Sequence, residues 1–147
     1  MIVLCGPPAC GKSALGRRLI SAVGGKFVRT DDLGRRRYER LPELVEGATV
    51  VEGTFYLPSH WARFLRIGED LFVVLVTCNV ETALRRNKER GESIPPRAII
   101  GIHRQFRVPP AVDLVLNTDL LDLEGALKVL LTSLSRRNYK YKVNENA

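Results

Sequence analysis

The 147-residue sequence lacks an apolar run long enough to cross a membrane. Its longest such run, from Leu71 to Val76, is far shorter than the roughly 20 residues that a membrane-spanning helix requires. We expect no cleavable signal peptide either, because Met1 runs directly into the apolar residues 2–4. We therefore expect a cytoplasmic protein.

Cysteine is scarce, and its pattern excludes two kinds of site. The chain has 3 cysteines, an odd number without metal-ligand spacing, so neither a disulfide framework nor a zinc site is expected. Cys5 and Cys78 end apolar runs and are predicted to be small core residues. Cys10 lies in a glycine-rich loop, where backbone amides would lower the pKa of a reactive thiol. A packing role is the alternative for Cys10.

The chain also lacks a linker-like stretch, and its length suits one domain. A hydrophobic content of 45% is enough for a real core. The net charge is +7, from 23 basic and 16 acidic residues, with a pI near 9.7. This excess favours polyanionic partners such as RNA, DNA or multiply phosphorylated ligands, although a solvated basic face is the alternative.

Strand-like and helix-like segments alternate along the chain. Short apolar runs predict strands over 2–5, 26–30, 49–52, 71–78 and 112–116. Helical spacing and end signals predict helices over 13–23, from residue 58 or 59 through Leu65, from Asn79 to Gly91 and over 96–106. A terminal helix is marked by Leu123, Leu127, Leu130 and Leu134. The charged segment 33–40 is expected to begin a helix or to form an exposed loop. This alternation predicts an α/β fold, a three-layer α/β/α sandwich with a five-stranded parallel sheet.

One loop matches the pattern G-x-x-x-x-G-K-[ST] at every required position. Its glycines let successive amide groups point inward as an anion nest, to which the following helix adds its positive end. Lys12 is expected to reach the β- and γ-phosphates of ATP, and the Ser13 hydroxyl to bind Mg²⁺. The predicted nucleotide-binding residues are Gly6, Pro7, Pro8, Ala9, Cys10, Gly11, Lys12, Ser13 and Ala14, together with Arg86, which could stack on the base.

Polar residues follow several predicted strands and are expected to meet at the carboxyl edge of the sheet. Asp31 and Asp32 could act as a general base or orient a substrate hydroxyl, and an N-cap pair is the alternative. Glu52 could hold metal-bound water or orient the acceptor, and a surface carboxylate is the alternative. The absence of an Asn-Lys-x-Asp motif argues against a GTPase switch, although a choice between ATP and GTP stays open.

A basic stretch is predicted to form a lid. Arg86 and Arg90 are four residues apart, so they share one face of a helix and could neutralise charge in the transition state. Arg97, Arg104 and Arg107 extend the same positive surface. The alternative is that these cations only offset a helix dipole.

The sequence resembles P-loop kinases that include polynucleotide 5′-kinases and O-phosphoseryl-tRNA kinases. The resemblance runs from residue 2 to about 110 and is carried by GPPACGKS, RTDD, VVEGTFY and ALRRNKERGESIPPRAIIGIHRQFRVP. It implies a P-loop NTP hydrolase/kinase fold, with Asp31 as general base and Arg86 and Arg90 as lid arginines. Glu52 stands where the relatives carry Asp, and the residues around Arg35 to Arg37 do not match them closely.

Together these features predict an ATP- and Mg²⁺-dependent kinase that phosphorylates a hydroxyl of RNA, tRNA or another polynucleotide. The predicted catalytic residues are Lys12, Asp31, Arg86 and Arg90, and the substrate residues are Asp31, Asp32, Arg35 and Glu52. Two alternatives remain: a kinase for a small molecule such as a nucleoside or amino-alcohol, and a nucleotide-gated RNA-binding module. We expect one kinase domain over 1–135 with its lid around 86–107, and a flexible basic tail over 136–147.

Overall fold

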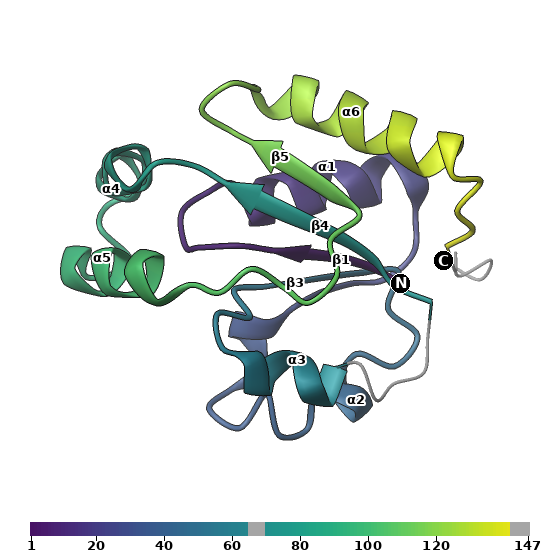
Figure 1. Ribbon diagram of the computed structural model, residues 1–147, viewed down its shortest axis with the longest axis horizontal. Helices are drawn as coiled ribbons and strands as arrows, with labels where there is room; N and C mark the ends of the chain where they lie inside the picture. The colour runs from purple at the N-terminus through teal and green to yellow at the C-terminus, as the bar shows by residue number, and fades with distance from the viewer. Residues whose placement is uncertain (65–69, 142–147) are drawn as a thin grey trace.

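The computed structural model, which describes residues 1–64 and 70–141, is built on a sheet of five parallel strands (Figure 1). The strands lie in the order β2-β3-β1-β4-β5. They are β1 (Ile2–Cys5), β2 (Phe27–Arg29), β3 (Val50–Gly53), β4 (Phe72–Thr77) and β5 (Leu114–Asn117). Each lies within two residues of its predicted range, so the five-stranded parallel sheet is confirmed.

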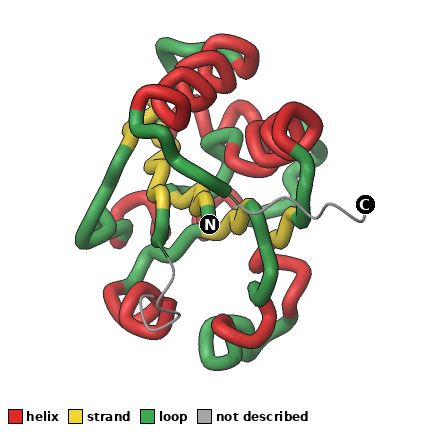
Figure 2. The backbone as a smooth tube through the Cα atoms, turned by 90° about the vertical axis from the view of Figure 1, so that its right-hand side faces the viewer, coloured by secondary structure: helices red, strands yellow, loops and turns green. Residues whose placement is uncertain are grey.

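Helices cover both faces of this sheet (Figure 2). On one face lie α1 (Lys12–Val23) and α6 (Leu123–Arg136), and on the other lie α2 (Leu41–Leu44) and α3 (Pro58–Phe64) (Figure 1). Two further helices, α4 (Val80–Glu89) and α5 (Pro96–Gln105), lie beyond the carboxyl ends of the strands, and a short 3₁₀ helix, η1 (Thr30–Leu33), follows β2. The predicted three-layer α/β/α arrangement is confirmed.

The central strands are apolar on both sides because both sides are covered. In β1, Ile2 and Leu4 pack with Leu15 and Leu130 in the core under α1 and α6. The alternate residues, Val3 and Cys5, pack in the opposite core. That second core also contains Leu41, Phe55, Trp61 and Phe64. Burial of apolar surface at about 25 cal/mol per Å² on both faces fixes β1 in the middle of the sheet.

Several local predictions need correction or fall outside the described residues. Of the two alternatives for the segment 33–40, the loop holds: the segment is mostly turn, and α2 begins only at Leu41. Asn79 occupies the N-cap of α4, but its side chain makes no capping bond; the Asp119 carboxylate accepts from the Asn79 amide instead (2.7 Å). Leu123, one of the leucines that mark the terminal helix, is 39% exposed. The helix predicted from residue 58 or 59 runs through Leu65, which lies outside the described residues.

The start of the expected tail contacts the body of the protein. Arg137 follows α6 and pairs with Asp113, and the Tyr139 hydroxyl oxygen lies 2.9 Å from the Met1 carbonyl oxygen and 2.6 Å from the Asp70 carbonyl oxygen. The tail from residue 142 onward lies outside the described residues. None of the helices in the described ranges 1–64 and 70–141 is both apolar enough and long enough to span a bilayer.

Candidate functional site

The phosphate loop joins β1 to α1 in a conformation that an L-residue rarely adopts. Gly6 has a φ of 144° and Gly11 a φ of 100°, and Ala9 is also left-handed at 61°. Gly6 is needed for close approach as well, because a Cβ atom there would lie 2.0 Å from the carbonyl oxygen of Val76 on β4. The loop therefore curls against the sheet and turns into the N-terminus of α1, where backbone amides favour anions.

Lys12 lies within this loop. Its side chain is buried, and its Nζ donates a hydrogen bond to the carbonyl of Pro7 (2.7 Å). Burial lowers the pKa of Lys12, and the negative charge of Glu52 opposes that shift. The ammonium group thus bridges the two ends of the loop and lies beside the amides that would receive a phosphate.

Ser13 and Glu52 come together at the first turn of α1. The Ser13 hydroxyl donates to Glu52 Oε2 (3.0 Å), and the Nε of Arg29 lies 3.5 Å from the same oxygen. No group of three potential His, Cys, Asp or Glu ligands occurs in ranges 1–64 and 70–141. A hydroxyl and one carboxylate nonetheless fit Mg²⁺, which prefers oxygen ligands, keeps several waters and shares the phosphates of a nucleotide.

A cavity of about 430 Å³ opens beside the loop. We name it the acceptor cavity, and its lining includes Lys12, Ser13, Asp31, Glu52 and Arg90. It is also lined by Pro8, Ala9, Gly11, Ala14, Arg17, Arg29, Thr54, Ser93 and Ile94. The register of β1 and β3, which pairs Cys5 with Gly53, brings the loop and Glu52 to the same edge.

The two aspartates after β2 are not equivalent. Asp31 lines the acceptor cavity, whereas Asp32 does not, and its carboxylate lies 3.9 Å from Arg29 NH1. Both residues lie inside η1, whose N-cap is Arg29, so the alternative of an N-cap pair is wrong. Only Asp31 is placed to meet a group held in the cavity.

The three arginines that follow η1, Arg35 to Arg37, also have different surroundings. Arg37 NH2 lies 3.9 Å from Asp31 Oδ1, while Arg36 pairs with Glu39 (2.7 Å) on the surface. Arg35 is exposed and does not line the acceptor cavity. The acceptor contact expected for Arg35 stays a prediction, and no spacing signal distinguishes Arg37 from its neighbours.

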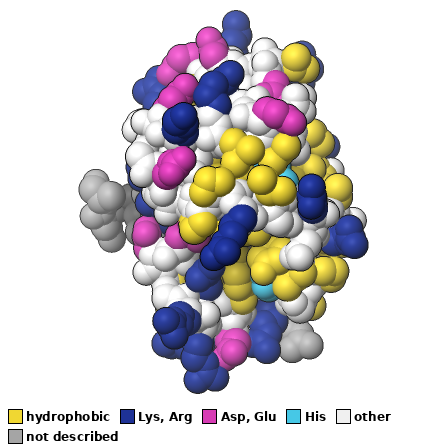
Figure 3. Space-filling view, turned by 90° about the vertical axis from the view of Figure 1, so that its left-hand side faces the viewer, with side chains coloured by type: hydrophobic (Ala, Val, Ile, Leu, Met, Phe, Trp, Pro, Cys, Tyr) yellow, Lys and Arg dark blue, Asp and Glu magenta, His cyan; other side chains and the backbone are white. Residues whose placement is uncertain are grey.

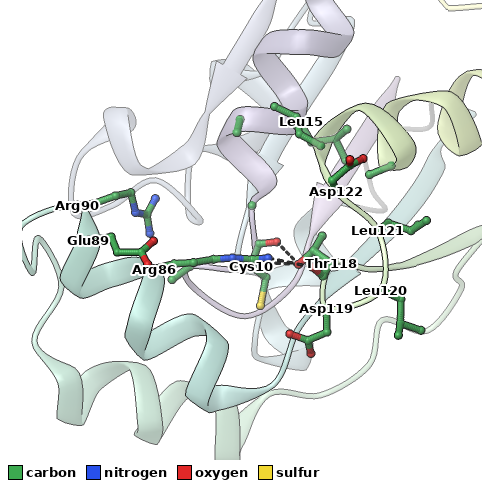
Figure 4. Close-up of a pocket in the computed structure, with 15 residues that line it drawn as sticks. Cys10, Leu15, Arg86, Glu89, Arg90, Thr118, Asp119, Leu120, Leu121 and Asp122 are labelled. Carbon is green, nitrogen blue, oxygen red and sulfur yellow. Dashed lines mark hydrogen bonds between the residues drawn. The ribbon is translucent and has the colours of Figure 1, made fainter.

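A second cavity, of about 540 Å³, lies on the other side of the loop between α4 and the loop after β5 (Figure 4). Arg86 reaches from α4 and donates to the Thr118 hydroxyl (2.8 Å) and to the Thr118 carbonyl (2.9 Å). The same hydroxyl lies 2.9 Å from the carbonyl of Cys10. The lining is Ala9, Cys10, Gly11, Ala14, Leu15, Arg86, Glu89, Arg90, Thr118, Asp119, Leu120, Leu121, Asp122, Leu123 and Ala126. We name it the base cavity, after the nucleobase on which Arg86 is expected to stack.

The segment predicted as a lid is held by one buried amide. Asn87 Nδ2 donates to the Ile94 carbonyl (2.7 Å), and the Ile94 amide donates to Asn87 Oδ1 (3.2 Å). This clasp orders the turn that carries Arg90, which lines both cavities. The ring of His103 on α5 lies 3.1 Å from the Pro8 carbonyl, so α5 also contacts the phosphate loop.

Three residues of the site were not predicted from the sequence: Asp119, Asn87 and His103. Asp119 could have been found by the rule used for the other strands, because it closely follows β5 and accepts from both Asn79 and Thr82. Asn87 and His103 carry no spacing signal, since their partners lie in loops whose path only the folded structure defines.

The cysteine expectations are partly wrong. The pKa of Cys10 is raised rather than lowered, mainly by its hydrogen bond with Cys78 and by burial. The same hydrogen bond lowers the pKa of Cys78. Cys5 is a buried core residue as predicted, and burial raises its pKa to about 12.

No family model matches the chain. In sequence it is 34% identical over 74 residues to a tRNA dimethylallyltransferase from Rickettsia canadensis, and the match covers 50% of this chain and 22% of the relative. The same enzyme from Rickettsia typhi is 30% identical over 92 residues, which is 63% of this chain and 29% of the relative. The matches span about a fifth to a third of these relatives' lengths.

Solved structures match over nearly the whole chain. A sugar kinase from Janibacter sp. HTCC2649 superimposes with a TM-score of 0.77 at 14% identity, covering 91% of this chain and 93% of that one. A gluconokinase from Sinorhizobium meliloti gives 0.70 at 16% identity, with 92% and 91% covered. The APS kinase of Mycobacterium tuberculosis, in complex with AMPPNP and APS, gives 0.69 at 21%, with 91% and 96% covered. The chain has the P-loop kinase fold.

Proposed function

We propose that this chain is an ATP-dependent kinase that transfers the γ-phosphate to a hydroxyl of RNA, tRNA or another polynucleotide. One observation carries the proposal: the phosphate-loop residues Lys12 and Ser13 share a cavity with the carboxylates of Asp31 and Glu52. Phosphoryl transfer to a hydroxyl requires a phosphate-binding loop that faces a carboxylate able to orient or deprotonate that hydroxyl.

In this proposal the loop binds and orients the triphosphate. The amides between Gly6 and Ser13 hold the β- and γ-phosphates, and the Lys12 ammonium neutralises the oxygens nearest to it. Ser13 and Glu52 would hold Mg²⁺, which supplies charge neutralisation across the β- and γ-oxygens when it is bound. The nucleobase of ATP lies in the base cavity. There the hydrogen bonds to Thr118 hold the Arg86 guanidinium in a position from which it can stack on the nucleobase.

Asp31 is the general base of the proposed reaction. Its carboxylate accepts the proton of the acceptor hydroxyl as that oxygen attacks the γ-phosphorus, and ADP leaves on the opposite side. Arg90 lines both cavities and can therefore neutralise charge on the transferring group. The Asn87 clasp on Ile94 keeps the turn after Arg90 in place while this happens.

Charge supports a polyanionic acceptor. Exposed arginines occur in two segments: Arg35, Arg36 and Arg40 follow η1, and Arg97, Arg104 and Arg107 lie on and after α5. Basic side chains flank apolar patches on the face at the carboxyl ends of the strands (Figure 3). Such a surface can track a phosphate backbone. The partial sequence relatives are named for a reaction on tRNA, which agrees with this acceptor class.

A small-molecule acceptor is the second candidate. The acceptor cavity of about 430 Å³ falls within the size range of small-ligand pockets. The similar structures include kinases named for sugar, gluconate and shikimate. In this alternative the exposed arginines would contribute to solubility or to the binding of ATP. A nucleotide-gated RNA-binding module, the third possibility, needs no base at Asp31.

A transfer screen tests these proposals. The protein is incubated with γ-labelled ATP and Mg²⁺ and with RNA carrying a 5′-hydroxyl, bulk tRNA, nucleosides or sugars, at low and moderate salt. We expect labelling of RNA or tRNA that weakens with salt and disappears in Asp31→Asn. Labelling of a metabolite alone would overturn the RNA acceptor. ATP-dependent RNA binding that is unaffected by Asp31→Asn, without any transfer, would overturn the kinase assignment.

A further inference from the structure

Two cysteines from distant parts of the sequence meet beneath the phosphate loop. The Sγ atoms of Cys10 and Cys78 lie 2.8 Å apart. A disulfide needs a separation of about 2.05 Å, so the two sulfurs have less than about 1 Å to close. Cys10 is held between two left-handed residues, Ala9 and Gly11, and Cys78 directly follows β4. Both thiols are therefore fixed by backbone that the fold itself requires.

The two thiols are chemically unequal. Cys10 is buried, whereas Cys78 is half-buried. Either thiol can donate in the hydrogen bond between them. That hydrogen bond, with a contribution from the Arg86 charge, lowers the pKa of Cys78. Cys78 is the better nucleophile, because it is the more exposed of the two thiols and the nearby Arg86 charge favours its thiolate, the reactive form. Cys5 provides a contrast: its buried thiol donates to the Val74 carbonyl (3.3 Å).

We propose that Cys10 and Cys78 are an oxidative modification site, at which a hydroperoxide converts the two thiols into an intrachain disulfide. The Cys78 thiolate attacks a peroxide oxygen, the O–O bond breaks, and Cys78 becomes a sulfenic acid while the other oxygen leaves as alcohol or water. The Cys10 sulfur then attacks Cys78 Sγ, the S–O bond breaks, and water leaves with the proton from Cys10. The two thiols lose two electrons, and the peroxide gains them.

The disulfide would act on the nucleotide through Cys10. The Cys10 carbonyl lies 2.9 Å from the Thr118 hydroxyl, which accepts from Arg86. Drawing the Cys10 side chain toward Cys78 moves one residue of the amide nest and the carbonyl that anchors Thr118. The oxidised protein therefore binds nucleotide more weakly than the reduced protein. This consequence rests on the proposed function, whereas formation of the disulfide does not.

Peptide mapping tests the site directly. The full chain is treated with hydrogen peroxide, the remaining thiols are alkylated, and the digest is analysed by mass spectrometry. We expect a Cys10–Cys78 cross-linked peptide in the wild type and in the matched control Cys5→Ala, and none in Cys78→Ser. The cross-link should raise the thermal midpoint by about 10 °C, reversibly with dithiothreitol. Alkylation of both Cys10 and Cys78 after peroxide, or a cross-link through Cys5, would overturn the proposal.

Calorimetry with ADP tests the consequence. Reduced protein should bind ADP, and peroxide-treated protein should bind it about threefold or more weakly, with affinity restored by dithiothreitol. Equal affinities would refute the effect on nucleotide binding and leave the modification site standing. If the reduced protein takes up no ADP, the proposed function fails and this consequence fails with it, while the peptide map still decides the disulfide.

Discussion

The hydroxyl of Ser13 donates a hydrogen bond of 3.0 Å to Oε2 of Glu52. The two residues are 39 positions apart, one in the first turn of α1 and the other in β3. They meet because β3 runs parallel to β1 in a register that pairs Leu4 with Glu52. Both strands therefore end at the same edge of the sheet. This contact is the basis for assigning one metal site to both residues.

Replacing Glu52 is expected to raise the Mg²⁺ requirement of the reaction. Glu52→Gln keeps the shape of the side chain but removes its charge, so the half-saturating Mg²⁺ concentration should rise about 10-fold or more. Initial rates measured against Mg²⁺ concentration check this. Glu46→Gln is the control, because Glu46 is exposed and only its carbonyl contacts Lys26. Identical Mg²⁺ curves for the wild type and Glu52→Gln would remove Glu52 from the metal site.

The two aspartates after β2 should differ in their effect on turnover. Asp31→Asn is expected to lower kcat by about 100-fold or more with ATP affinity nearly unchanged, because a general base acts only in the chemical step. Asp32→Asn should reduce kcat far less, since Asp32 does not line the acceptor cavity. Steady-state kinetics and nucleotide titration of the two variants make the comparison. A larger loss in Asp32→Asn than in Asp31→Asn would reverse the assignment.

Gly6 should be the glycine least tolerant of a side chain. A Cβ at Gly6 would lie 2.0 Å from the Val76 carbonyl oxygen, in addition to the strain of a φ of 144°. Gly47 has a φ of 73° with nothing within 4 Å of the added atom. Urea unfolding should show a loss of about 1 kcal/mol for Gly47→Ala, and of more than about 3 kcal/mol for Gly6→Ala. Similar losses would mean that the close approach to β4 is not rigid.

His60 should make the protein less stable in acid. Its pKa is lowered by burial and by the charge of Arg37, and its Nδ1 has no hydrogen-bond partner among the described residues. Below the usual pKa of about 6.5 the unfolded chain takes up a proton more readily than the folded chain. The free energy of unfolding therefore falls as the pH drops from about 7.5 to about 5.

Urea unfolding at these two pH values tests the assignment to His60. His60→Gln removes the titrating ring, so the difference in unfolding free energy between the two pH values should shrink. The His60 ring also stacks on the Tyr38 ring, with 3.7 Å between the ring centroids. The variant is therefore expected to lose some stability at both pH values. An unchanged pH difference in the variant would show that other groups cause the acid sensitivity.

The sheet was predictable because its signals are local. Runs such as Ile2 to Cys5 are apolar throughout, and parallel strands covered on both faces require that pattern. The phosphate loop was equally readable, since its glycines and Lys12 have fixed spacing. The grouping of Asp31 and Glu52 at one edge followed from the rule for strand ends in parallel sheets.

The rest of the site depends on contacts between segments that carry no common spacing. Arg37, rather than Arg35, faces Asp31 because of the path of a turn-rich segment that helical periodicity does not describe. The hydrogen bond between Cys10 and Cys78, together with burial, raises the pKa of Cys10 against the expected lowering, and the sequence does not show that the two thiols meet. Pairings of this kind become visible only when the loops are placed in space.

The most direct test of the account is a calorimetric titration of Mg-ATP into the wild type and into Lys12→Ala. Lys12 bridges the phosphate loop through Pro7, whereas Lys26, the matched control, contacts the Glu46 carbonyl on the surface. We predict saturable binding in the wild type and in Lys26→Ala, and affinity lower by about 10-fold or more in Lys12→Ala. No heat of binding in the wild type, or equal affinity in all three proteins, would contradict the account.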